Sequence, residues 1–135
     1  MLKHATAASV CPYCGVGCGL LLNTSGGKLA GLEYMRAHPT NEGALCPKGN
    51  ACLEIAYHTE RLLYPLKRVG DEFVRVAWGE ALDLVAKNLH HIQTEHGADA
   101  LAFLASAKVT NEENYLFQKM ARMLGTNNID HCARL

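Results

Sequence analysis

The segment CPYCGVGCGL, residues 11–20, contains three cysteines, and the segment ALCPKGN, residues 44–50, adds a fourth. The four residues Cys11, Cys14, Cys18 and Cys46 follow the spacing C-x2-C-x3-C-x27-C. Glycines alternate with other residues through the second half of the first segment. A loop that wraps a metal centre has to turn sharply and bring backbone N–H groups toward sulfur, and glycine permits both. The spacing therefore predicts a loop that folds around a metal centre with thiolate ligands.

The kind of metal centre follows less directly from these letters. The chain has six cysteines, and in a cytosolic protein such clusters indicate metal or redox chemistry rather than disulfides. The spacing and the proline that follows Cys46 favour an iron–sulfur cluster. Zinc ribbons usually pair two C-x2-C knuckles, whereas Cys46 is followed by Pro-Lys-Gly, with Cys52 six residues later. A structural zinc site and a disulfide or redox pair stay open as alternatives.

The length and composition of the chain limit the classes of function that it can have. A chain of 135 residues has room for one domain, or for one small domain and part of another. Its formal net charge is zero, which argues against nucleic acid as a partner, because phosphate binding needs an excess of Lys and Arg. No apolar run approaches the roughly 20 residues that span a bilayer, and no export signal is visible. We therefore expect a cytoplasmic location.

The first sixty residues predict a small α+β domain with β-hairpins around the cysteine cluster. Leu20 to Leu22 form an apolar strand, Ser25 to Gly27 turn, and Leu29 to Tyr34 return. Residues 61–78 read as a connector, in which Gly70-Asp71 turn and Phe73 to Val76 form a strand.

Residues 79–135 predict the beginning of an α/β domain. A helix ends at Gly97 and carries one apolar face. The run DALAFLA, residues 99–105, reads as a buried strand, and a second helix begins with a capping box formed by Thr110 and Glu113. That helix ends at Gly125, and a further strand begins at Ile129. One complete strand cannot bury both faces of a sheet, so this domain is expected to be incomplete. The apolar face of the first helix comprises Leu82, Val85, Leu89 and Ile92.

Further segments of the chain resemble one known family. CPYCGVGCG, TNEGALCPKGN, RLLYPLKR, the helix start at Trp78 and GTNNIDHCAR are similar to the N-terminal region of the molybdenum or tungsten bis-pterin oxidoreductases. The resemblance implies that Cys11, Cys14, Cys18 and Cys46 hold a 4Fe–4S cluster. It also implies a molybdenum or tungsten bis-molybdopterin guanine dinucleotide in the complete subunit. In the family a lysine at the place of Lys48 lies between cluster and pterin, so Lys48 is expected to bind the cofactor and to lie on the electron path.

The tail favours formate dehydrogenase within this family. Assimilatory nitrate reductases share the cluster motif but typically lack the run from Cys132 to Arg134. The resemblance implies oxidation of formate to CO2, or its reverse, with electrons passed to an iron–sulfur or flavin partner subunit. An assimilatory nitrate reductase fragment, a free-standing ferredoxin-like electron carrier and a zinc-stabilised module are the alternatives.

The same resemblance places the catalytic metal ligand one position past Leu135, so no catalytic residue is expected in this chain. In the family that ligand is cysteine or selenocysteine, and selenocysteine is encoded by a stop codon. We therefore expect a reading frame truncated at a selenocysteine, whose product alone is inactive. The other cysteines and histidines are expected to have structural or no special roles. Cys52 is predicted to be a small buried residue, and His131-Cys132 a packed pair rather than a metal site. The side chains of His90, His91 and His96 are predicted to be solvated.

Overall fold

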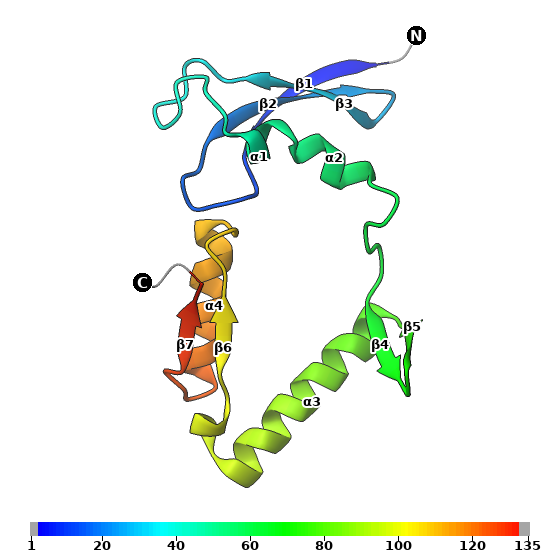
Figure 1. Cartoon of the computed structure of the whole chain (residues 1–135), viewed down its shortest axis with the longest axis vertical. Coiled ribbons are helices and arrows are strands. Elements are labelled where there is room, and N and C mark those ends of the chain that lie inside the picture. The colour runs from blue at the N-terminus through cyan, green and yellow to red at the C-terminus, as the bar shows by residue number, and fades with distance from the viewer. Residues whose placement is uncertain (1–2, 133–135) are drawn as a thin grey trace. The chain divides into compact units, whose positions relative to one another are not determined.

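The computed structural model describes residues 3–132 of the chain, which divides into two compact units. The first unit contains the residues up to Thr59 together with Ser106–Tyr115. The second contains Glu60–Ala105 and the residues from Leu116 onward. Figure 1 labels the helices and strands of both units.

A three-stranded antiparallel sheet, in the order β1-β2-β3, forms the first unit (Figure 1). Strands β2 (Gly19–Ser25) and β3 (Lys28–Tyr34) confirm the expected hairpin. Gly26 and Gly27 connect them with φ of 59° and 79°. A two-residue loop with both φ values positive matches the right-handed twist of the strands, and glycine adopts it without steric cost.

The strand β1 (His4–Val10) was missing from the sequence prediction. Its residues HATAASV are small or polar and lack the alternation of apolar residues by which a half-buried strand is recognised. Backbone pairing with β2 holds β1 in place instead, in a register that sets Val10 opposite Gly19. The cysteine loop 11–18 therefore joins the ends of two paired strands.

Two short helices follow the sheet, α1 (Pro47–Asn50) and α2 (Cys52–Tyr57). Proline suits the first position of α1, because its fixed φ is helical and its missing N–H has no partner there. At the end of α2 the Tyr57 hydroxyl accepts a hydrogen bond of 2.7 Å from the Leu29 backbone N–H, which ties α2 to β3. Leu20, on β2, is 1% exposed and is the most buried large side chain of this unit.

The second unit begins with a hairpin where the sequence predicted a connector with one strand. The strands are β4 (Leu66–Val69) and β5 (Glu72–Arg75), so Val76 lies outside the strand that was assigned to it. The predicted turn at Gly70 is present, with φ of 61°. The sequence missed β4 because Leu66–Val69 contains two adjacent basic residues rather than alternating apolar ones.

A parallel β-α-β arrangement completes the second unit, and the first residues of its second helix, up to Tyr115, belong to the first unit. The long helix α3 (Trp78–His96) leads through the 3₁₀ turn η1 (Ala98–Ala100) to β6 (Phe103–Ala105). Helix α4 (Asn111–Met123) then returns the chain to β7 (Ile129–His131), which pairs with β6 in parallel. These pairings confirm the expected start of an α/β domain.

The predicted strand 99–105 is wrong in its first half. Ala98–Ala100 form the 3₁₀ turn, and only Phe103–Ala105 are extended and paired, because β7 provides just three partner residues. The buried core consists of Leu101, Phe103 and Ala121, and the ring of Phe103 meets that of Phe117 edge-on at 5.4 Å.

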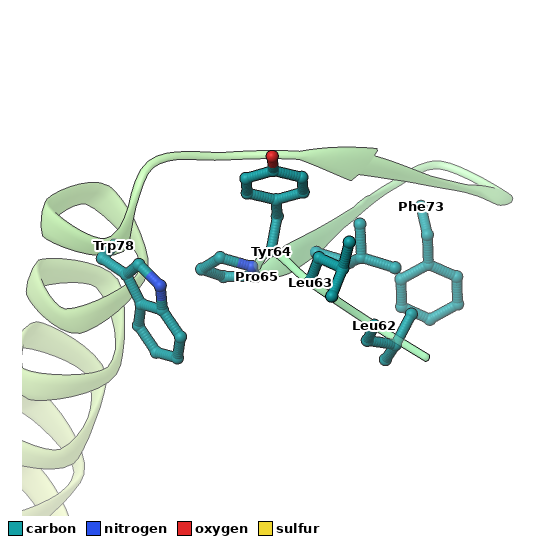
Figure 2. Close-up of a pocket in the computed structure, with 7 residues that line it drawn as sticks. Leu62, Leu63, Tyr64, Pro65, Phe73 and Trp78 are labelled. Atoms are coloured by element: carbon teal, nitrogen blue, oxygen red, sulfur yellow. The ribbon is translucent and has the colours of Figure 1, made fainter. Parts of the chain in front are cut away.

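The apolar face of α3 is covered only toward its carboxyl end. Leu89 and Ile92 pack against the core, whereas Leu82 and Val85 are 61% and 56% exposed. Near the amino end of the same helix, apolar side chains surround a cavity of about 560 Å³ (Figure 2). Its lining comprises Leu62, Leu63, Tyr64, Pro65, Leu66, Phe73 and Trp78. Among the described residues, no helix is long and apolar enough to cross a membrane.

The capping box at the start of α4 is confirmed. The Thr110 backbone N–H donates to Glu113 Oε2 at 2.7 Å, and the Glu113 N–H donates to Thr110 Oγ1 at 3.3 Å. Each side chain thereby satisfies a backbone donor at the helix start.

We expect Thr110→Ala to lower the free energy of unfolding by about 1 kcal/mol, because one backbone donor of the first turn loses its acceptor. Urea unfolding followed by circular dichroism measures the change. Thr94→Ala is the matched control, since the Thr94 hydroxyl bonds to the His90 carbonyl within α3 and caps nothing. A change no larger than that of the control would contradict the capping role.

Candidate metal centre

The loop 11–18 is closed at its base by the backbone. The N–H of Cys11 donates to the carbonyl oxygen of Cys18 at 2.8 Å, so the first and third cysteines of the motif face each other across the loop ends. Gly17 has φ of 70°, a conformation that favours glycine and lets the loop reverse direction. Asn111 supports the tip, where its Nδ2 donates to the Gly15 carbonyl at 2.9 Å. Cys11 itself is 6% exposed.

The second segment places Cys46 beside this loop. Cys46 is the N-cap residue of α1, with φ −70° and ψ 168°. The backbone of Gly49 on α1 lies against the first loop, since a Cβ atom added to Gly49 would stand 3.7 Å from the Cys11 sulfur. The same added atom would be 3.3 Å from Leu45 Cδ2, so the Leu45 side chain would have to shift by a few tenths of an ångström to admit it.

The pKa of the Cys18 thiol responds to burial and to the other three cysteines of the motif. Burial raises the pKa of the Cys18 thiol, and the negative charges of Cys11, Cys14 and Cys46 raise it further. Like charges disfavour one another when they are close, so this thiol senses every other member of the motif. A metal centre that binds the four sulfurs as thiolates would offset this repulsion.

The pKa of Cys46 moves in the opposite direction. The backbone N–H of Gly49 lowers it most, followed by the N–H of Lys48, and the Lys48 ammonium adds a smaller effect. The sulfur makes no capping hydrogen bond within the usual distance and angle limits, so these are electrostatic effects of nearby N–H groups. The start of α1 thus stabilises negative charge on Cys46 even though the thiol is exposed to solvent.

The donor set fits an iron–sulfur cluster in its chemistry. Soft thiolates select iron–sulfur clusters or zinc, and N–H groups directed at sulfur help to set the reduction potential of a cluster. All four thiols and the N–H groups of α1 belong to one compact unit. Within residues 3–132, no group of three or more His, Cys, Asp or Glu side chains is placed to hold a single metal ion. The assignment of the four cysteines as ligands stays a prediction.

The other residues that the sequence singled out lie in environments that do not indicate metal binding. Lys48 is exposed on α1, and Cys52 is half-buried rather than fully buried. Burial and the charge of Cys11 raise the pKa of the Cys52 thiol, and its side chain lines a small apolar cavity with Leu20 and Leu53. The three histidines of α3 that were expected to be solvated, His90, His91 and His96, are exposed. His131 and Cys132 are exposed at the end of the second unit, and the rest of that tail lies outside the described residues.

The asparagines that hold the cysteine segments in place were not predicted from the sequence. The Asn50 Nδ2 donates to the carbonyls of Leu45 and Cys46 at 3.0 and 3.2 Å, and its Oδ1 accepts from the Tyr34 hydroxyl at 2.7 Å. Asn50 therefore fastens Cys46 to the end of β3. A polar residue four positions after a proposed ligand was the available signal, but its partners are set by tertiary structure.

Comparison with known proteins identifies the family. The model of the molybdopterin oxidoreductase Fe4S4 domain matches residues 4–58, and that of the molybdopterin oxidoreductase matches residues 61–135. An F420-dependent formate dehydrogenase subunit alpha of Methanocaldococcus jannaschii is 48% identical over 128 residues, which are 94% of this chain and 18% of that protein. The F420-dependent formate dehydrogenase 2 subunit alpha of Methanococcus maripaludis is 43% identical over 136 residues, or 100% of this chain and 20% of that protein.

A solved structure shares the fold. Acetylene hydratase from Pelobacter acetylenicus superposes with a TM-score of 0.66 at 24% identity, covering 92% of this chain and 18% of its own. The chain therefore belongs to the molybdopterin oxidoreductase family, whose cofactors are a 4Fe–4S cluster and a molybdenum or tungsten pterin. It spans about a fifth of the length of the curated relatives that it matches.

In the metal-free chain at pH 7, we expect Cys46 to react several-fold faster than Cys18 with iodoacetamide. The lowered pKa of Cys46 leaves more thiolate at neutral pH, while the raised pKa of Cys18 leaves less. Timed alkylation in the presence of a chelator, read by peptide mass spectrometry, measures both rates. Lys48→Gln should slow Cys46 only slightly, because the Gly49 N–H is the larger cause. Equal rates at the two thiols would contradict the charge distribution described above.

Proposed function

We propose that this chain is the amino-terminal, cluster-binding part of a formate dehydrogenase catalytic subunit. Support comes from the Fe4S4 domain match over residues 4–58 together with relatives at 43–48% identity that are named formate dehydrogenase alpha subunits. The observation that carries the proposal is the convergence of two cysteine segments, the loop 11–18 and the start of α1, within one unit.

In this proposal Cys11, Cys14, Cys18 and Cys46 hold the cluster as thiolates. A 4Fe–4S cluster, when bound, takes up and releases one electron at a time. The chain's part is to keep the four sulfurs in place and to surround them with groups of fixed polarity. The backbone N–H groups of Lys48 and Gly49 favour negative charge beside Cys46, which favours the reduced state of the site.

Lys48 is the proposed relay position, between the cluster and the pterin of the complete subunit. Its ammonium lowers the pKa of the Cys46 thiol, so it acts on the same charge that reduction would increase. Its side chain is exposed in this chain, which leaves it accessible to a second cofactor. A solvated lysine with no role in electron transfer is the competing interpretation.

We further propose formate oxidation to CO2, or its reverse, as the reaction of the whole subunit, with electrons passed to a partner subunit of iron–sulfur or flavin type. The family match over residues 61–135 favours this reading over a free-standing ferredoxin-like carrier, which does not need an α/β segment. The division at residues 60 and 78, the cytoplasmic location and a selenocysteine ligand past Leu135 stay predictions.

Anaerobic reconstitution with iron and sulfide should give about four iron and four sulfide per chain, with brown colour bleached by dithionite. Replacing any one of Cys11, Cys14, Cys18 or Cys46 by serine should lower the iron content or the stability of the cluster, because a hard hydroxyl replaces a soft thiolate. Iron and acid-labile sulfide analysis measures the outcome.

Two cysteines outside the motif provide matched controls for this experiment. Cys52→Ser and Cys132→Ser should retain the wild-type iron content, since neither residue belongs to the proposed ligand set. Full iron loading after loss of a motif cysteine, or a chain that takes up zinc but no iron, would overturn the cluster assignment.

We expect Lys48→Gln to shift the midpoint potential of the reconstituted cluster to a more negative value by on the order of 30 mV, because a nearby cation stabilises the reduced, more anionic form. A potentiometric titration followed by electron paramagnetic resonance (EPR) measures the shift. Lys28→Gln, which removes an exposed lysine at the start of β3, should leave the potential unchanged. Identical potentials in both variants would argue for the solvated-lysine interpretation.

A further inference from the structure

The distance along the chain between Cys18 and Cys46 raises the question of what fixes their relative position. The three cysteines of the loop 11–18 are held by strands β1 and β2, whereas 27 residues separate Cys18 from Cys46, which lies at the start of α1. Between them runs β3 and then an irregular turn over residues 35–46. A sulfur at the end of such a turn is positioned only as well as the turn is fastened to the sheet.

The side chain of Asn41 makes that connection. The Gly19 backbone N–H donates to Asn41 Oδ1 at 2.8 Å, and Asn41 Nδ2 donates to the Gly19 carbonyl at 3.1 Å. The same Nδ2 also donates to the Ala44 carbonyl at 2.8 Å. One amide therefore uses both of its hydrogens and its oxygen, and it joins the residue after Cys18 to the residue two before Cys46.

At this position β2 has no partner residue in β3, and the Asn41 amide takes the place of that partner. The last pair between β2 and β3 sets Leu20 opposite Tyr34, so Gly19 lies one residue beyond the end of β3. Asn41 hydrogen-bonds both backbone groups of Gly19 in the way that a neighbouring strand residue would. Gly19 is buried, and an unpaired backbone group there would carry a desolvation cost.

The local sequence fits this close approach. A Cβ atom added to Gly19 would overlap the imidazole ring of His38, so only glycine lets the turn reach the strand. Within the turn Glu42 has φ of 45° and Gly43 has φ of 82°. A left-handed conformation at a non-glycine residue is uncommon and persists where the surroundings hold it. The Ala44 N–H closes the turn by donating to the Asn41 carbonyl at 2.7 Å.

We propose that Asn41 is a positioning residue of the cluster, which holds Cys46 in register with Cys11, Cys14 and Cys18. This inference rests on the proposed function, because it needs the four cysteines to share one cluster. Asparagine is specifically suited: aspartate would face two carbonyl oxygens with a carboxylate, and alanine would leave Gly19 unpaired. Loss of the Asn41 hydrogen bonds is expected to displace Cys46 before the other three cysteines, because the loop 11–18 stays connected to strands β1 and β2.

The test uses the full chain, reconstituted anaerobically, and compares Asn41→Ala with Asn23→Ala. Asn23 is the matched control because its amide also makes two side-chain hydrogen bonds in this sheet, to Thr6 and Glu33 at 2.6 Å each. It lies four residues along β2 from Gly19, about 13 Å away at the rise of a strand. Iron release to a chelator should be about tenfold faster in Asn41→Ala than in wild type, and unchanged in Asn23→Ala.

A second readout identifies the thiol that is lost. When ferricyanide takes one electron from the cluster and one Fe²⁺ departs, a 3Fe–4S cluster remains, with one cysteine freed. EPR should show more of this species in Asn41→Ala, and alkylation with mass spectrometry should find the label on Cys46. A general loss of stability would instead label the four cysteines alike. Asn41→Asp, which retains the acceptor for Gly19 but no donor, supplies the same comparison should Asn41→Ala not fold.

The outcomes separate the two proposals. Fast iron loss with label on Cys46 supports the positioning role. A wild-type chain that binds no cluster overturns the proposed function and this inference with it. A stable wild-type cluster that Asn41→Ala and Asn23→Ala both retain equally well overturns the role of Asn41 alone, and leaves the cluster assignment standing.

Discussion

The arrangement of the first unit depends on bringing two distant cysteine segments together and keeping them there. Thiolates repel one another, and burial together with the charges of its three neighbours raises the pKa of the Cys18 thiol. Neither a disulfide nor a long helix fixes the second segment, because no disulfide forms within residues 3–132 and α1 has only four residues. Backbone pairing of β1 with β2 and amide side chains from the turns therefore carry the positional information.

Three asparagines share this work from different parts of the chain. Asn111 holds the tip of the cysteine loop, Asn41 joins its end to the turn before Cys46, and Asn50 fastens the Cys46 carbonyl to β3. An asparagine amide offers a donor and an acceptor in one plane, so it substitutes for a strand residue where the sheet ends. Such contacts order irregular backbone without adding charge next to an anionic cluster.

In the second unit, few apolar side chains are buried and many are exposed. Its core is limited to a few residues around Phe103, and the amino-terminal half of α3 presents Trp78, Leu82 and Val85 to solvent. Together with the apolar pocket beside Trp78, these side chains form an exposed apolar surface.

Local sequence signals determined most of the regular elements and the ligand set proposed for the cluster. The β2–β3 hairpin, the capping box at Thr110 and the ends of α3 and α4 at glycines depend on neighbours in the chain, so their spacing is enough to predict them. The C-x2-C-x3-C-x27-C pattern likewise names candidate ligands without a structure. Strands β1 and β4 were not predicted, because their extended conformation depends on backbone pairing and not on a pattern in their own side chains.

What only the tertiary structure decided is the environment of Cys46 and what holds the turn that leads to it. Its low pKa arises from the N–H groups of α1, and its place is set by Asn41 and Asn50, whose partners are far away in sequence or are backbone atoms. The same limit applies to α3, where the helical period gave one apolar face but not the fact that only Leu89 and Ile92 are covered. Periodicity records which residues are apolar, whereas burial depends on what the rest of the fold brings against them.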